Sequence, residues 1–194
     1  MLEVKSPLLG AVGRPSTPRK VQGFTLVELM VTIAVATLLM MVAVPNYVTF
    51  QRNAQLSDAV SNFMSAVNAA RGNAIQQSRN TYLVPLDGTN WSSGWFVYAD
   101  VNWDKNYTAG TDELILESTA PSLALTITTP TATTPPDNSL VSGYFLFNGS
   151  GYPKSKTAGL AIGKIVMANA YRSSTVNIDA TGRVRSCKTG STGC

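Results

Sequence analysis

A long apolar run that contains a single carboxylate constrains this chain more than any other feature. The run extends from Phe24 to Val44 and holds 21 residues. As a helix it would be about 30 Å long, enough to cross the hydrocarbon core of a membrane. Glu28 is its only charge, and a charge in such a segment is costly and by default functional. Because Glu28 lies near the start of the run, an ordinary anchor that tolerates a terminal charge remains an alternative.

The residues before this run are polar and basic. Residues 1–23 carry four basic residues and one glutamate. A secretory signal has its apolar stretch upstream of a small-residue cleavage site. Here Gly23 precedes the stretch, so cleavage at Gly23 would leave the stretch on the mature protein. The positive-inside rule keeps the leader (1–23) cytoplasmic, which predicts a single membrane span (24–44) and an external remainder.

The junction KVQGFTLVE, from Lys20 to Glu28, resembles the class III leader junction of type IV pilins and type II secretion pseudopilins. The resemblance implies cleavage between Gly23 and Phe24 by a prepilin peptidase, followed by N-methylation of Phe24. It also implies that Glu28 pairs with the N-terminus of a neighbouring subunit during assembly. A buried carboxylate needs a cation, and a new α-amino group supplies one. The leader is longer than the family's usual short one, so we expect the true start codon to lie within it.

This resemblance further implies a cellular location and a set of partners. We expect a single-pass protein of a bacterial inner membrane, with its C-terminal domain in the periplasm, that later joins a pilus or pseudopilus filament. The implied partners are other pilin or pseudopilin subunits, the prepilin peptidase and the membrane.

Beyond the span, the pattern predicts an amphipathic helix over residues 45–79 and then a β-rich domain over residues 80–194. The helix carries an apolar stripe at helical spacing: Leu56, Val60, Phe63, Val67, Ala70 and Ala74. The expected strands are Tyr82–Leu86, Gly94–Val101, Glu113–Ser118, Leu123–Thr128, Ser142–Asn148, Leu160–Ala168, Thr175–Asp179 and Arg183–Cys187. Residues 129–138 read as a surface loop. The sequence thus predicts an α+β fold, in which a long N-terminal helix packs on a small antiparallel two-sheet β domain.

Four further segments, taken in order, resemble the FimT/GspH branch of minor pilins and pseudopilins. They are Ala70–Ile75 (ARGNAI), Gly94–Asn102 (GWFVYADVN), Glu113–Leu116 (ELIL) and Gly182–Arg185 (GRVR). The resemblance covers most of residues 20–187. It implies a long N-terminal helix that carries a small β-rich domain, in agreement with the periodicity.

The composition argues against an enzyme. The chain contains no histidine, so the commonest general base near neutral pH is absent. No G-x-S-x-G elbow or phosphate-binding loop occurs. Asp100, Asn102 and Asp104 resemble the first half of a calcium loop, but Lys105 replaces the required glycine and Thr111 stands where a glutamate should be. We therefore expect an Asp/Asn turn rather than a metal site, and no cofactor.

The two cysteines, Cys187 and Cys194, both lie in the C-terminal tail. In an extracytoplasmic domain a disulfide between them would persist and would fix the tail locally. Two free thiols remain the alternative.

Charge is divided along the chain. Residues 81–139 have a net charge of −6, whereas residues 140–194 have a net charge of +6. A basic C-terminal third suits a polyanion such as duplex DNA. The candidate DNA-binding residues are Lys154, Lys156, Arg172, Arg183, Arg185 and Lys188. These charges could instead protect edge strands or meet the acidic face of a neighbouring subunit.

Two functions therefore compete. In the first, the chain is a FimT-like minor pilin of a type IV pilus that binds duplex DNA, independently of sequence, during natural transformation. The G-R-x-R sequence favours this hypothesis, because FimT-like proteins that bind DNA carry such a motif at this place. In the second, it is a GspH-like structural pseudopilin at the tip of a type II secretion pseudopilus and contacts protein only.

Overall fold

The computed structural model describes residues 23–121, 125–131, 136, 138–157 and 159–191. The chain divides into two compact units, Met1–Ala43 and Val44–Cys194. In the first unit, the described residues are exposed, and they are helical from Leu26 onward.

Helix α1 (Leu26–Gln77) contains Pro45 in its interior. Its first turn is capped by Thr25, whose hydroxyl accepts a hydrogen bond of 3.2 Å from the Glu28 N–H. This is the pattern of an N-cap that satisfies a free donor of the first turn. Within the described part of the chain, α1 alone is long and apolar enough to cross a membrane, judged by length and composition.

The C-terminal part of α1 forms one wall of the hydrophobic core. The apolar stripe expected from the sequence is confirmed, because all six of its members are buried: Leu56, Val60, Phe63, Val67, Ala70 and Ala74. Phe63 lies edge-on to two tryptophans, with ring centroids 5.7 Å from Trp91 and 5.2 Å from Trp95. The helix thereby packs on the sheets through a continuous apolar face.

Two antiparallel sheets form the rest of the second unit. A five-stranded sheet has the order β3–β2–β1–β5–β6, and a four-stranded sheet has the order β4–β7–β8–β9. The first comprises β1 (Thr81–Pro85), β2 (Gly94–Ala99), β3 (Glu113–Thr119), β5 (Phe145–Phe147) and β6 (Pro153–Lys154). The second comprises β4 (Thr126–Thr128), β7 (Gly163–Ala168), β8 (Ser173–Ile178) and β9 (Val184–Lys188). Two short 3-10 helices, η1 (Trp91–Ser93) and η2 (Ser139–Ser142), lie between strands.

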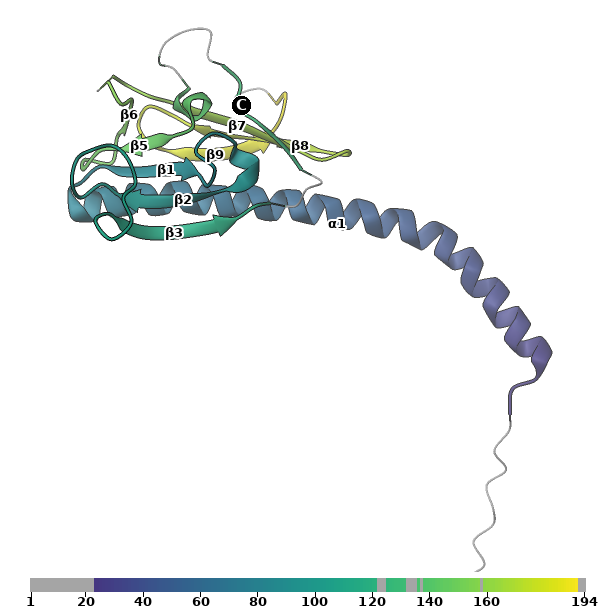
Figure 1. The fold of residues 1–194 in the computed structure, drawn as a ribbon. Coiled ribbons are helices and arrows are strands. Elements are labelled where there is room, and N and C mark those ends of the chain that lie inside the picture. The colour runs from purple at the N-terminus through teal and green to yellow at the C-terminus, as the bar shows by residue number, and fades with distance from the viewer. Residues whose placement is uncertain (1–22, 122–124, 132–135, 137, 158, 192–194) are drawn as a thin grey trace, which may run out of the picture. The chain divides into compact units, whose positions relative to one another are not determined.

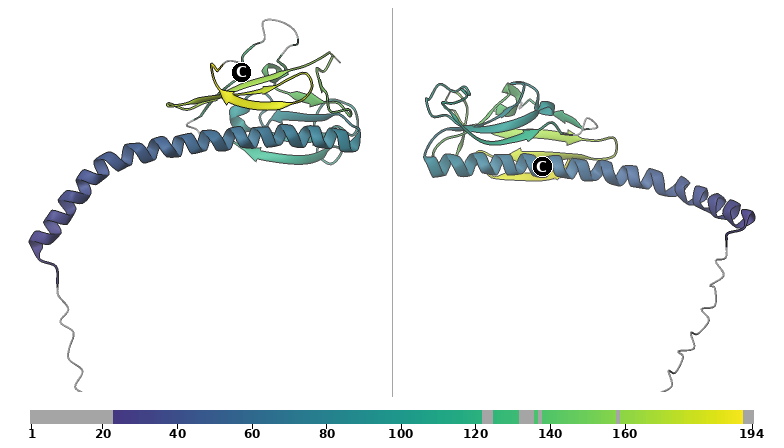
Figure 2. Two further views of the ribbon diagram at one scale, coloured as in Figure 1. Left: turned by 180° about the vertical axis from the view of Figure 1, so that it is seen from behind. Right: turned by 60° about the horizontal axis from the view of Figure 1, so that its bottom comes forward.

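Both sheets turn one face toward the C-terminal part of α1. Figure 1 shows this part of the helix lying along the strands, and Figure 2 shows the same packing from behind and from below. Trp95 and Phe145 from one sheet and Ile165 and Val176 from the other join a single cluster of buried residues with the helix. The expected α+β fold, a long helix packed on two antiparallel sheets, is therefore confirmed.

The outer faces of the two sheets differ. On the five-stranded sheet, Tyr82, Tyr98 and Leu146 form a second buried cluster. The loop between β2 and β3 covers this cluster with Tyr107, whose ring lies 5.3 Å from that of Tyr98. On the four-stranded sheet, cross-strand neighbours on the outer face include Lys164, Asn177 and Arg185.

Several strand boundaries differ from those expected. A strand beginning at Ser142 is wrong, because Ser139–Ser142 form η2, capped by Asn138 and ended by Gly143 in the left-handed conformation. Leu160 makes only an isolated bridge, and Arg183 lies in a turn before β9. The expected strand at Leu123 begins outside the described residues.

Two further differences concern residues that local sequence describes poorly. β6 was missed because it has two residues and one of them is Pro153, which cannot donate to a ladder and so suits an edge. Asn138 is buried rather than on a surface loop, and its amide bonds the Pro130 and Lys164 carbonyls at 2.8 and 2.7 Å.

Candidate interaction surfaces

The N-terminal segment presents the predicted processing residues at the surface. Phe24 is 81% exposed, and Glu28 is exposed in the first turn of α1. Cleavage after Gly23, methylation of Phe24 and the assembly role of Glu28 stay predictions. Glu28 also stands three residues after the capping Thr25, in the T-x-x-E pattern of a capping box. Sequence reasoning missed this local role, although the pattern is readable.

The G-R-x-R segment begins in a tight turn organised by Asp179. The Asp179 carboxylate accepts hydrogen bonds from the Thr181 and Arg183 N–H groups at 2.9 and 3.1 Å, and from the Thr181 hydroxyl. Desolvation opposes ionisation of this carboxyl, but these hydrogen bonds and the nearby Arg185 charge outweigh it and lower the pKa of Asp179. The turn therefore holds Arg183 in a defined position relative to Arg185.

Arg71 of α1 ties this turn to the helix. Its Nε donates to the Gly151 carbonyl at 3.1 Å and its Nη1 donates to the Gly182 carbonyl at 3.2 Å. Gly182 is buried with a φ of 81°, and a Cβ there would lie 2.8 Å from the Gly151 oxygen. Two of the segments noted in the sequence, Ala70–Ile75 and Gly182–Arg185, are therefore joined by one side chain.

Arg183 and Arg185 are both exposed, as an interaction surface requires. Arg185 is directly opposite Asn177, and Asn177 is directly opposite Lys164 on the next strand. Lys164 and Arg185 therefore flank Asn177 on the outer face of the four-stranded sheet. Sequence reasoning counted Lys164 among the basic charges but did not select it as a site residue, because the register of β7 against β8 cannot be read locally.

Lys188 and Arg172 lie elsewhere. Lys188 is three residues after Arg185, so in a strand it projects from the opposite face, where it lines a hollow with Arg172 and Asn53. The β7–β8 connection there meets the helix, because Asn169 Nδ2 bonds the Arg52 carbonyl at 2.8 Å. The Arg183 turn meets the helix at Arg71, 19 residues further on, which is about 28 Å of helix.

Lys154 and Lys156 occupy a third place, on and just after β6, where they line a pocket together with Lys105 and Tyr82. The six candidate DNA-binding residues are thus distributed over three surfaces rather than one. Arg183 and Arg185 are both exposed at one of these surfaces, and a role for them in binding DNA stays a prediction.

Cys187 lies in β9 opposite Thr175. Its expected disulfide partner, Cys194, lies outside the described residues. The pairing of the two stays a prediction.

The Asp100–Asp112 loop uses its carboxylates to hold backbone. Asp100 Oδ2 accepts from the Lys105 N–H at 3.1 Å, and Asp112 accepts from the Val101 and Thr108 N–H groups at 2.9 and 2.7 Å. These bonds fix the loop that carries Tyr107 over the outer aromatic cluster. Among the described residues, no group of three His, Cys, Asp or Glu side chains is placed to hold a metal ion.

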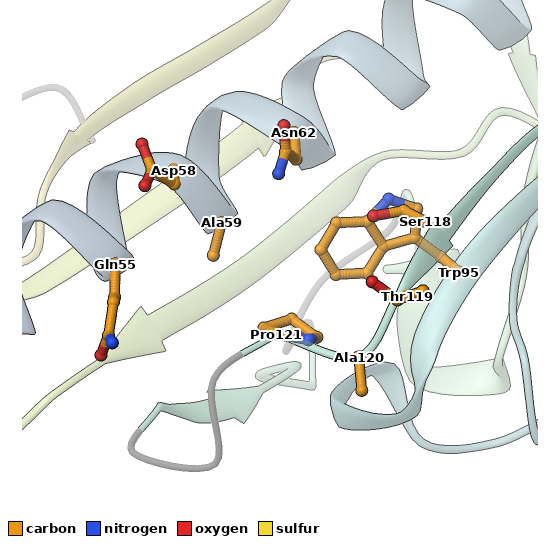
Figure 3. A pocket seen from close by; sticks show the side chains of 9 residues that line it. All are labelled: Gln55, Asp58, Ala59, Asn62, Trp95, Ser118, Thr119, Ala120 and Pro121. Atoms are coloured by element: carbon orange, nitrogen blue, oxygen red, sulfur yellow. The ribbon is translucent and has the colours of Figure 1, made fainter.

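A shallow groove of about 190 Å³ runs between α1 and the end of β3. Figure 3 shows Gln55, Asp58 and Asn62 on the helix side, and Trp95 beside Ser118 and Thr119 on the strand side. The indole Nε1 of Trp95 is buried without a hydrogen-bond partner in the described part of the chain. The groove offers polar contacts but pairs no nucleophile with a general base.

A long N-terminal helix whose first part is apolar, and whose second part is buried under two antiparallel sheets, defines a pilin-like subunit. Two family models match the chain: Type II transport protein GspH over residues 59–182, and the prokaryotic N-terminal methylation motif over residues 18–44. The first match spans more than half of the chain, so the chain belongs to the GspH family. It is a minor pilin or pseudopilin of a type IV pilus or type II secretion system, and the family's members are structural proteins rather than enzymes.

Solved structures agree on the fold. Two crystal forms of the type IV minor pilin FimU from Pseudomonas aeruginosa (strain PAO1) each give a TM-score of 0.51 at 13% identity. The alignments cover 70% and 68% of this chain and 90% and 91% of FimU. A comparison with curated protein sequences found no match.

The matches also bear on location and on the basic surface. The apolar start of α1 and the methylation motif are consistent with an inner-membrane prepilin and with a pilus subunit. The GspH match ends at Gly182, so Arg183 and Arg185 lie beyond it.

Proposed function

We propose that this chain is a minor pseudopilin of a type II secretion system, a structural subunit that contacts other subunits. The observation that carries the proposal is the match to Type II transport protein GspH over residues 59–182. That range contains the buried helical stripe from Val60 to Ala74 and β1–β8. The proposal needs no catalysis from the domain, in keeping with a groove that pairs no nucleophile with a base.

Assembly in this proposal depends on the N-terminal segment. Cleavage after Gly23 makes Phe24 the new N-terminus, and the methylation motif over residues 18–44 supports this step. Glu28 then lies four residues from its own N-terminus and offers a carboxylate to the α-amino group of a neighbour. In a packed apolar bundle, removing one partner of such a pair strongly destabilises the assembly, because it leaves the other charge buried and unpaired.

The test compares two substitutions in cells that lack the native copy of the gene. Glu28→Gln removes the charge but can still accept and donate hydrogen bonds, whereas Thr25→Ala removes the helix cap and keeps the carboxylate. We expect Glu28→Gln to reach the membrane normally but to lose cross-linking to neighbouring subunits and export of the secreted proteins. Thr25→Ala should retain most of both. Equal losses in the two variants would mean that Glu28 acts through the helix cap, and unchanged secretion without this chain would contradict the proposal.

A second candidate function, DNA binding as part of a type IV pilus, is favoured by one observation. Arg183 and Arg185 are exposed, and Arg185 shares the outer face of the four-stranded sheet with Lys164. Guanidinium groups suit phosphate oxygens through paired hydrogen bonds. No aromatic residue occurs between Asp179 and Cys194. Base stacking is therefore absent from this segment, and binding would be independent of sequence.

Fluorescence anisotropy with a labelled DNA duplex, using the full-length protein in a neutral detergent, tests this candidate. Arg183→Gln with Arg185→Gln should flatten the dependence of log Kd on log salt by about 2. The matched control, Arg172→Gln with Lys188→Gln, removes the same charge from the hollow that Arg172 and Lys188 line with Asn53 and should change the slope less. An equal effect in both variants would indicate non-specific attraction, and no binding at low salt would leave the secretion function alone.

A further inference from the structure

Three lysines from separate segments meet around a pocket on the covered face of the five-stranded sheet. Lys105 comes from the loop after β2, Lys154 from β6, and Lys156 from the segment after β6. The pocket has a volume of about 300 Å³, and Tyr82 and Leu146 form part of its wall. All three lysines lie outside the buried core. The packing of the sheet therefore does not explain why these like charges lie together.

The wall of this pocket contains a polar group without a partner. Tyr82 is 1% exposed, and its hydroxyl finds no hydrogen-bond partner among the described residues. Burying a hydroxyl in this way is unfavourable, and in native proteins it calls for a ligand or a specific role. Burial, helped by the charge of Asp100, raises the pKa of Tyr82. The phenol therefore stays protonated at neutral pH and can donate.

Two of the rim lysines, Lys105 and Lys156, are held by specific contacts. Lys105 has a φ of 65°, which is unusual for a residue with a side chain. Its N–H is held by Asp100 Oδ2 at 3.1 Å, and its Nζ donates to the Lys156 carbonyl at 3.2 Å. The Lys156 N–H in turn donates to the Tyr144 hydroxyl at 3.0 Å, and the Lys156 Nζ lies 5.1 Å from the centre of that ring. The ammonium of Lys105 is thus fixed to the backbone of Lys156.

The chemistry of the donors selects the ligand. Ammonium groups can only donate hydrogen bonds, and the protonated Tyr82 phenol has a free O–H to donate, so a ligand that satisfies them must supply several acceptor oxygens. A phosphate group presents oxygens in more directions than a carboxylate and can meet donors on different sides of a pocket. Asp100 and Asp104 lie close enough to Tyr82 to act on its pKa, and they offset part of the positive charge. Binding should therefore be moderate and should depend on the lysines.

We propose that the pocket bounded by Lys105, Lys154, Lys156 and Tyr82 binds a phosphate group. The group is either free inorganic phosphate or the phosphate monoester of a larger molecule, because both present the same oxygens to the pocket. This site is separate from the Arg183 turn and from the N-terminal assembly segment.

The test measures the ³¹P NMR line width of inorganic phosphate added to the full-length protein in maltoside micelles, which contain no phosphorus. We expect saturable broadening, and for Lys154→Gln with Lys156→Gln an apparent Kd weakened roughly fivefold or more. Tyr82→Phe should weaken binding by a smaller factor, while the free energy of unfolding stays the same or rises, because the lost hydroxyl had no partner. That combination separates a ligand role from a structural one.

Controls decide the remaining outcomes. Lys164→Gln with Lys188→Gln removes the same charge elsewhere on the domain and should leave the broadening unchanged. Broadening by glycerol 3-phosphate but not by inorganic phosphate would identify the ester as the source, and broadening by both would identify the phosphate group itself. The proposal is overturned if neither compound broadens, if the control pair loses binding equally, or if acetate competes as well as phosphate.

Discussion

The five-stranded sheet covers an aromatic outer face with its own loop, whereas the outer face of the four-stranded sheet is polar and partly exposed in the described part of the chain. Tyr82 and Tyr98 stack with ring centroids 5.2 Å apart under Tyr107. On the other sheet, Lys164, Asn177 and Arg185 lie across neighbouring strands, with Lys164 and Asn177 partly exposed and Arg185 exposed. Both sheets use their inner faces for the same helix. One outer face therefore adds to stability, while the other is available for charged contacts.

Truncation on the covered face should have the largest effect. Tyr98 is 2% exposed between Tyr82 and Tyr107, so Tyr98→Ala should lower the free energy of unfolding by about 3–5 kcal/mol. Thr128→Ala, in β4 on the open face, should stay within about 0.5 kcal/mol of wild type. Denaturant titration of the full-length protein in detergent, followed by tryptophan fluorescence, gives both values. Similar losses in the two variants would contradict the inference that the outer face of the five-stranded sheet contributes more to stability.

A smaller loss is expected at the turn before β9. Gly182→Ala meets an unfavourable φ and places a Cβ 2.8 Å from the Gly151 oxygen, so it should cost about 1–3 kcal/mol. Gly190 has a similar φ of 83°, and among the described residues no atom lies within 4 Å of a Cβ placed there. Gly190→Ala therefore isolates the backbone cost, and the difference between the variants in the same titration measures the close contact. No difference would mean that the Gly151 carbonyl, which Arg71 also binds, moves aside at little cost in free energy.

Acid should weaken the same turn. The pKa of Asp179 is lowered in the folded protein, so the ionised carboxylate contributes to the free energy of unfolding. This contribution is fully present above the ordinary pKa of about 4. It is lost as the pH falls through the lower pKa of the folded protein. Asn in its place can still accept the three hydrogen bonds. Wild type should thus be more stable than Asp179→Asn at pH 6, and the difference in the free energy of unfolding should shrink steadily as the pH falls below the ordinary pKa of about 4. A constant gap across this range would contradict the role of the charge.

The smallest effect on stability is expected for the arginine pair. Arg183 and Arg185 are exposed, so Arg183→Gln with Arg185→Gln should change the free energy of unfolding by less than about 0.5 kcal/mol. The same titration measures it. A larger loss would show that these side chains stabilise the open sheet and would shift their role from contact to folding.

The fold was readable from the sequence where the signal is local. The stripe from Leu56 to Ala74 follows helical spacing, and the Thr181-Gly182 turn has its usual composition. The partner of each strand was not readable, because β1 pairs with β5 across more than 60 residues. Such long-range pairing depends on packing against the helix rather than on local propensity.

The candidate surfaces were less predictable for the same reason. Counting charges identified a basic C-terminal third and grouped Lys154, Arg172 and Arg183 as candidate DNA-binding residues. The structure places them at β6, at the β7–β8 connection and at the β8–β9 turn. Lys105 and Tyr82 were not considered together, because 23 residues separate them and only the fold brings them to one pocket.

The charges on the two open sheet edges have a consequence for symmetry. The edge strand β3 carries Glu113 and Glu117, and the edge strand β9 carries Arg185 and Lys188. Two copies that met through equal edges would bring like charges together, which disfavours a closed two-fold dimer through either edge. A basic edge that faces an acidic edge on the next molecule is instead a heterologous contact, which can repeat without closing. The charge split therefore disfavours a closed pair formed through equal edges.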